Sequence, residues 1–203
     1  MRVCGLMSKF NGVKTNNAKI RAKCDIREYV MSQIDRQSVL DIFCGTGEMY
    51  NSVWHKAMNY QGIDKVKFFD CRNTLCGDAD KLIRRVDLTR FNIFDIDSYG
   101  SPYEILDYLT QTIRPSGDVA FVITDGISID LRLGRVCKGI RNLVGIENHV
   151  LKRASKMHDD IINIIAIEVS KRLKMRISSI RIAKGKTGAS MRYWSITLTH
   201  DAV

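Results

Sequence analysis

The chain has few of the features that mark membrane, metal-binding or disulfide-rich proteins. Its longest apolar run, residues 161–167, is interrupted by Asn163 and is far shorter than the roughly 20 residues that span a bilayer. The six cysteines form no C-x-x-C pair and the four histidines are scattered, so the sequence predicts neither a metal site nor a disulfide framework. Only two prolines occur among 203 residues, and no segment is repetitive or of low complexity. We expect a cytoplasmic protein with reduced thiols and no membrane partner.

What is present fits one α/β domain, since 203 residues lie within the single-domain range. Short apolar segments alternate with segments of helical periodicity, which favours a mostly parallel sheet with helices on both faces. Strands are expected at residues 38–43, 60–64, 74–77, 91–96, 118–124, 177–183 and 192–199. Helices are expected at residues 17–34, 48–58, 79–86, 102–113, 129–143 and 150–173.

The most informative segment is residues 38–48, where an apolar strand runs into a glycine turn and then a helix. Gly45 and Gly47 lack the Cβ atoms that keep a ligand away from the backbone. The segment has neither the G-x-x-x-x-G-K-[ST] spacing of a phosphate-binding loop nor a third glycine at position 50, which is tyrosine. Asp41, inside the strand, suits a ligand with an ammonium group, and its buried carboxylate needs a dedicated partner. The segment therefore predicts a nucleotide-type ligand beyond the carboxyl end of the strand.

The next strands also end in polar residues. Asp64 follows Asp41 by 23 residues, and it either accepts ribose hydroxyls or caps the turn at Lys65. Asp78 lies in a Gly-Asp-Ala turn and either contacts a ligand or forms a local Asx turn. The fourth strand runs into Asp97. Because the carboxyl ends of parallel strands meet at one edge of a sheet, these groups are expected to form one site.

The pattern D-x-F-C-G-T-G at residues 41–47 resembles motif I of class I S-adenosylmethionine-dependent methyltransferases. The resemblance implies S-adenosyl-L-methionine as cofactor and a Rossmann-like, seven-stranded sheet that is mostly parallel with an antiparallel final strand. It also implies that an N-terminal segment, residues 1–37, caps the cofactor and that residues 38–203 form the methyltransferase domain. By this resemblance, with Asp78 facing the adenine amine, the cofactor-binding residues are Asp41, Phe43, Gly45, Gly47, Asp64, Asp78, Ala79 and Asp95.

The run Asp95-Ile-Asp-Ser-Tyr-Gly-Ser-Pro102 resembles the D-x-D-P-[FY]-G-[ST]-P motif of the tRNA guanine-N2 dimethyltransferase family, and residues 122–125 resemble its T-x-T-D stretch. The resemblance implies catalytic roles for Asp97, Ser98 and Tyr99, with Asp97 facing the guanine amine. Acceptors restore electron density to such an amine, and Tyr99 offers a face on which a base can stack. Ser98 stands where that family usually has proline. The chain has no Pro-Pro, which amino-methylating DNA enzymes use, and no Pro-Cys, which cytosine-C5 methyltransferases need.

Charge is concentrated in the last third of the chain. Residues 131–203 hold 15 basic and five acidic residues, so they carry the whole net charge of +10. The residues expected to bind nucleic acid, four of them spaced as one helical face, are Arg132, Arg135, Lys138, Arg141, Lys152 and Arg153. Such a stripe is typical of proteins that bind a polyanion, and we expect RNA rather than DNA. Lys23 and Arg27 either contact phosphates as well or form a solvated helix face.

Several alternatives stay open. The chain could methylate a base amine of DNA, or act as an inactive nucleic-acid-binding subunit with a methyltransferase fold. It could also methylate a small molecule, in which case the basic third would be incidental. The sequence also leaves open whether the chain forms a homodimer or joins a partner subunit.

Overall fold

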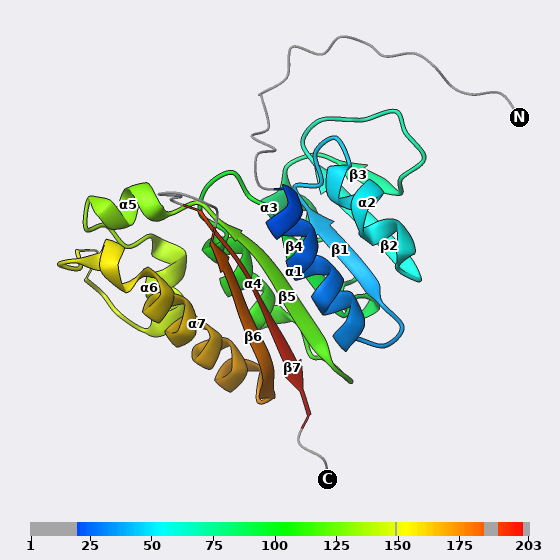
Figure 1. Cartoon of the computed structure of the whole chain (residues 1–203). Coiled ribbons are helices and arrows are strands. Elements are labelled where there is room, and N and C mark those ends of the chain that lie inside the picture. The colour runs from blue at the N-terminus through cyan, green and yellow to red at the C-terminus, as the bar shows by residue number, and fades with distance from the viewer. Residues whose placement is uncertain (1–19, 149, 185–190, 201–203) are drawn as a thin grey trace, which may run out of the picture.

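Seven strands form one sheet in the computed structural model, which describes residues 20–148, 150–184 and 191–200 (Figure 1). The strands are β1 (Ser38–Ile42), β2 (Asn59–Asp64), β3 (Thr74–Cys76), β4 (Ile93–Ile96), β5 (Val119–Asp125), β6 (Arg176–Lys184) and β7 (Arg192–Thr199). Their order is β3-β2-β1-β4-β5-β7-β6. The first five strands pair in parallel, whereas β7 is antiparallel to both β5 and β6. This topology confirms the Rossmann-like sheet with an antiparallel final strand.

The helices cover both faces of the sheet. They are α1 (Ile20–Gln33), α2 (Glu48–Ser52), α3 (Ala79–Leu82), α4 (Tyr103–Thr112), α5 (Ser128–Arg132), α6 (Lys138–Val144) and α7 (His158–Leu173). Short 3-10 helices are η2 (Trp54–Lys56), η3 (Leu88–Arg90) and η4 (Ala154–Met157). Figure 1 shows α1 on one face and α4 on the other, and the two buried apolar clusters follow the same division.

The central strands are buried on both faces, as their largely apolar sequences predict. Every residue of β1 and every residue of β5 is buried. On one face, Val30 of α1 packs with Val53 and Trp54 against β1, β4 and β5. The α1 helix is therefore part of the layer that covers the sheet. The expected N-terminal cap also includes residues 1–19, which lie outside the described residues.

The helices are shorter than the sequence predicts, because the chain leaves the helical region at specific residues. The helix expected at 129–143 is two helices, α5 and α6, with Gly134 between them at φ 70°. The helix expected at 150–173 begins only at His158, as α7, because Arg153 has a left-handed φ of 62°. The helix expected at 48–58 ends at Ser52, since Val53 has φ −132°. The helix expected at 79–86 is only α3.

Residues 17–19 of the expected first helix, and residues 185–190 between the last two strands, lie outside the described residues. Within the described ranges, no helix combines the length and the hydropathy that crossing a membrane requires.

Candidate active site

The glycine turn lies at the carboxyl end of β1 and is held against β2 by backbone hydrogen bonds. The amides of Phe43 and Cys44 both donate to the carbonyl of Ile63, at 2.8 and 3.0 Å. Gly45 and Gly47 adopt left-handed conformations, with φ of 49° and 84°, that favour glycine. Phe43 also has a positive φ of 69°, so the chain begins to turn before the first glycine. The result is a tight loop that has room beside the backbone at Gly45, whereas the side chain of Arg72 covers Gly47.

Asp41 is a buried carboxylate with one unsatisfied oxygen. It is 1% exposed, and the hydroxyl of Tyr60 donates to its Oδ2 at 2.8 Å, which confirms the expected dedicated partner. Its Oδ1 has no hydrogen-bond partner among the described residues. Burial, with the charge of Asp95 across the β1–β4 pairing, raises the pKa of Asp41 well above its usual range. A cationic donor placed here would relieve this cost.

Asp64 and Asp78 both make local contacts with the backbone. The two oxygens of Asp64 accept from the amides of Gly45 and Val66, each at 2.8 Å, so this residue ties β2 to the glycine turn. Asp78 caps α3 by accepting from the amide of Lys81 at 3.3 Å. A carboxylate oxygen accepts more than one hydrogen bond, so these contacts leave capacity for a ligand. Their expected roles toward ribose and adenine stay predictions.

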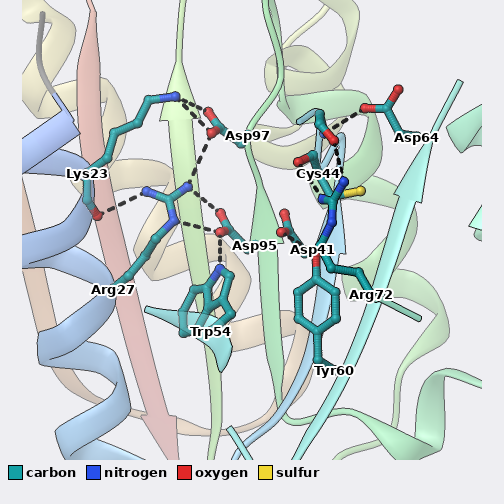
Figure 2. Close-up of polar contacts among 11 residues, drawn as sticks. Lys23, Arg27, Asp41, Cys44, Trp54, Tyr60, Asp64, Arg72, Asp95 and Asp97 are labelled. Carbon is teal, nitrogen blue, oxygen red and sulfur yellow. Dashed lines mark hydrogen bonds and ion pairs between the residues drawn. The ribbon is translucent and has the colours of Figure 1, made fainter. Parts of the chain in front are cut away.

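Asp95 is fully buried, and both of its oxygens are occupied (Figure 2). Arg27 donates to them through Nε at 2.6 Å and Nη2 at 2.7 Å, and Trp54 Nε1 adds a bond of 2.7 Å. Burial raises the pKa of Asp95, and the guanidinium of Arg27 offsets part of this effect. These hydrogen bonds connect α1, through Arg27, and η2, through Trp54, to the centre of the sheet.

Asp97 lies just beyond β4 and faces α1. Lys23 Nζ donates to its two oxygens at 2.7 and 2.8 Å, and Arg27 Nη2 lies 3.7 Å away. Burial alone would raise the pKa of Asp97, but the charges of Arg27 and Lys23 outweigh burial and lower the pKa. Next in the chain, the side chain of Ser98 is buried and donates to the carbonyl of Gly100 at 3.3 Å. Tyr99 is 86% exposed, so the same loop presents an ionised acid and an open aromatic ring.

A buried polar network at the end of β5 supports the loop of residues 97–102. At the end of β5, Asp125 accepts hydrogen bonds from the hydroxyl of Tyr103 and the ring of His158. The next residue, Gly126, donates its amide to the carbonyl of Gly100 at 3.2 Å. The conformation of residues 97–102 is therefore coupled to β5, α4 and α7.

Several of the polar groups in the site were not predicted as such. Lys23 and Arg27, which are expected to contact phosphates or to form a solvated helix face, instead turn inward to Asp97 and Asp95. One signal was present, because a carboxylate in the apolar strand at 91–96 requires a buried cation. Nothing in the local sequence marks Trp54 as the second donor to Asp95. Nor does it mark Arg72, which donates to the carbonyls of Cys44 and Gly45, as a neighbour of the glycine turn.

The basic residues form a patch rather than the predicted helical stripe. Because Gly134 separates α5 from α6, Arg132 and Lys138 lie on different helices. Arg135 instead pairs with Val150 in an isolated β-bridge, which brings residues 152–153 beside the end of α5. Arg141 is half-buried and donates to the carbonyl of Glu147 at 3.2 Å. We use the name bridge patch for the exposed residues Arg132, Arg135, Lys138, Lys152 and Arg153.

Comparison with known proteins gives a clear result for the fold only. No protein-family model matches the sequence, and no curated protein matches it significantly. Trm1 from Pyrococcus horikoshii, in complex with S-adenosyl-L-methionine, aligns with a TM-score of 0.58 at 15% identity, over 92% of this chain and 56% of its own. M. jannaschii TYW2 in complex with AdoMet aligns with a TM-score of 0.53 at 11% identity, over 93% of this chain and 79% of its own. The plantazolicin methyltransferase BpumL, in complex with a desmethylPZN analog and SAH, aligns with a TM-score of 0.51 at 15% identity, over 91% of this chain and 84% of its own. These similarities, together with the strand order, show that the chain has the class I methyltransferase fold.

Proposed function

We propose that the chain is an S-adenosylmethionine-dependent methyltransferase that acts on an exocyclic base amine of a nucleic acid. The substrate that fits best is RNA, with guanine N2 in a tRNA-like context as the acceptor. The observation that carries the proposal is the edge of the sheet where the glycine turn and the unsatisfied oxygen of Asp41 lie at the end of β1, with Asp97 and Tyr99 just beyond the neighbouring β4. The fold itself favours a ligand at this edge.

The residues present fit the cofactor. When bound, it supplies an electrophilic methyl group. The backbone beside Gly45 has room for its amino-acid end, and the unsatisfied oxygen of Asp41 matches an ammonium group. Asp64 and Asp78 are candidates for the ribose and the adenine. Asp95 is fully buried and accepts three hydrogen bonds from Arg27 and Trp54, so we assign it a positioning role for α1 rather than a contact with the cofactor.

The acceptor would lie against the loop after β4. Asp97 is ionised and can accept the N–H groups of an amine, which increases the electron density on nitrogen. Tyr99 offers an exposed ring for stacking with a base. Lys23 covers both oxygens of Asp97 in this structure, so an acceptor must displace the Lys23 ammonium or share the carboxylate with it.

The bridge patch supports a polyanionic substrate. Its five members are exposed, and none of them forms an ion pair with another described residue. Gly126, at the end of β5, donates to Gly100 in the loop that follows Asp97, and α5 begins two residues later at Ser128. The bridge patch, which starts at the end of α5, therefore lies at the same edge of the sheet as Asp97. Two of the similar structures are Trm1 and TYW2, whereas BpumL was solved with a desmethylPZN analog, so the fold is compatible with other acceptors.

A second candidate function is a nucleic-acid-binding subunit without catalysis. The two hydrogen bonds from Lys23 to Asp97 favour it, because they occupy the acid that would face the acceptor. A binding subunit and a methyltransferase would both use the bridge patch to bind nucleic acid, but only the methyltransferase would transfer a methyl group.

The test is binding followed by transfer. Calorimetry with S-adenosylhomocysteine measures cofactor binding, and radiolabelled transfer from S-adenosylmethionine to total RNA and to DNA measures activity. Mass spectrometry of the nucleosides then identifies the base. Asp97→Asn should lower transfer by about 100-fold or more with cofactor affinity unchanged, whereas the exposed control Asp80→Asn should change neither. Tight cofactor binding without transfer to any nucleic acid supports the binding subunit. Transfer that persists at high salt argues for a small acceptor, because nucleic-acid affinity falls steeply with salt.

A further inference from the structure

Arg72 reaches the glycine turn from the connection between β2 and β3. Its Nη1 donates to the carbonyl of Cys44 at 3.2 Å, and its Nη2 donates to the carbonyl of Gly45 at 2.9 Å. The side chain is only 2% exposed although its neighbours in the chain, Cys71 and Asn73, are exposed. A Cβ atom added to Gly47 would lie 2.6 Å from the guanidinium carbon. The cation is therefore pressed against the turn.

The guanidinium has a partner that a ligand could replace. Asp70 accepts from Nε at 2.9 Å and from Nη2 at 2.7 Å, but the side chain of Asp70 is 35% exposed and belongs to a surface connection. Four of the five N–H groups of Arg72 are used in these contacts, and one N–H of Nη1 has no acceptor among the described residues. Arginine forms its strongest contacts with carboxylates, which match its planar fork.

Charges of opposite sign thus lie around one turn. Figure 2 shows Arg72 on the side of Asp41 and Tyr60, across from the group formed by Lys23 and Arg27. Both charges act on the thiol of Cys44: burial and then Asp41 raise its pKa to about 12, while Arg72 lowers it in part. An α-amino acid carries one ammonium and one carboxylate on the same carbon. A zwitterion of this kind fits a turn that has both an unsatisfied acid and an arginine near it.

We propose that Arg72 binds the α-carboxylate of the cofactor's methionine moiety, while the ammonium on the same carbon faces Asp41. The inference rests on the proposed function and adds to it a residue that determines specificity. It makes the amino-acid end of the cofactor, rather than the adenosine end alone, a main determinant of affinity. Asp70 then acts as an internal carboxylate that occupies Arg72 in the absence of ligand.

The test compares two ligands that differ only at this end. S-adenosylhomocysteine has the amino-acid group, and 5′-methylthioadenosine lacks it. Calorimetry with the full chain is expected to show that Arg72→Gln binds S-adenosylhomocysteine about ten- to a hundred-fold more weakly, as for a lost charge-assisted contact, and binds methylthioadenosine as the wild type does. The matched control is Arg84→Gln, since Arg84 packs over Tyr108 away from the turn. It should change neither affinity.

An equal loss for both ligands would overturn the inference, because it would mean that Arg72 only supports the turn. Asp70→Asn provides a second measurement should Arg72→Gln fail to fold. Removing the competing carboxylate should tighten binding of S-adenosylhomocysteine severalfold and leave methylthioadenosine unchanged; an equal change for both ligands, or no change for either, overturns the inference. If the wild-type chain binds neither ligand, the proposed function itself fails.

Discussion

The ion pair between Arg27 and Asp95 allows a quantitative test of how α1 is held on the sheet. Both side chains are almost fully buried, at 1% and 0% exposed, and two N–O contacts of 2.6 and 2.7 Å join them. Arg27→Met keeps an apolar stem of similar length but leaves the carboxylate with Trp54 as its only donor among the described residues. Breaking a buried pair by removing one partner costs about 3–5 kcal/mol. Since small domains unfold with about 5–15 kcal/mol, we expect a large loss.

Urea unfolding followed by tryptophan fluorescence measures the effect, because Trp54 and Trp194 are both buried. The matched control is Lys56→Met, which removes a surface pair with Glu28 at 4.0 Å where both side chains are more than half exposed. This control should cost no more than about 1 kcal/mol. The double variant Arg27→Met with Asp95→Asn should recover part of the loss, since asparagine removes the charge and keeps an acceptor for Trp54.

The loss should also depend on pH. Burial already raises the pKa of Asp95, and removing Arg27 raises it further. A raised carboxyl pKa destabilises the folded state as the pH rises above the unfolded value of about 3.9. Arg27→Met should therefore be less destabilised at pH 5 than at pH 8. The reasoning is refuted if Arg27→Met costs no more than Lys56→Met, or if its cost is the same at both pH values.

Two further predictions concern the other acids of the site. Asp41→Asn should raise the free energy of unfolding at pH 7 and weaken binding of S-adenosylhomocysteine, because burial raises the pKa of Asp41 and its charge costs stability as the pH rises; a destabilised variant with full affinity contradicts this. Lys23→Met should lower stability at pH 7, and this loss should shrink as the pH falls through the lowered pKa of Asp97, because Arg27 and Lys23 lower that pKa and their contribution disappears once Asp97 is protonated. Urea unfolding across pH checks the second, and a constant difference would count against it.

Much of the architecture could be predicted because it depends on local periodicity. The seven strands lie within two residues of their expected bounds, since each is a short run rich in apolar residues that is bounded by polar or glycine residues. Helix lengths were overestimated where single residues, such as Val53 and Arg153, leave the helical region, because tertiary contacts rather than periodicity decide those ends.

Chain order along the parallel strands was enough to place Asp41, Asp64, Asp78 and Asp97 at one edge of the sheet, because parallel strands present their carboxyl ends together. The partners of these acids were decided by the tertiary structure alone. Tyr60 comes from a neighbouring strand, Lys23 from α1, and Arg72 from a surface connection. Each contact joins residues 19 or more positions apart, so no spacing rule could reveal it. The same holds for the bridge patch, which a single β-bridge assembles from two separate segments.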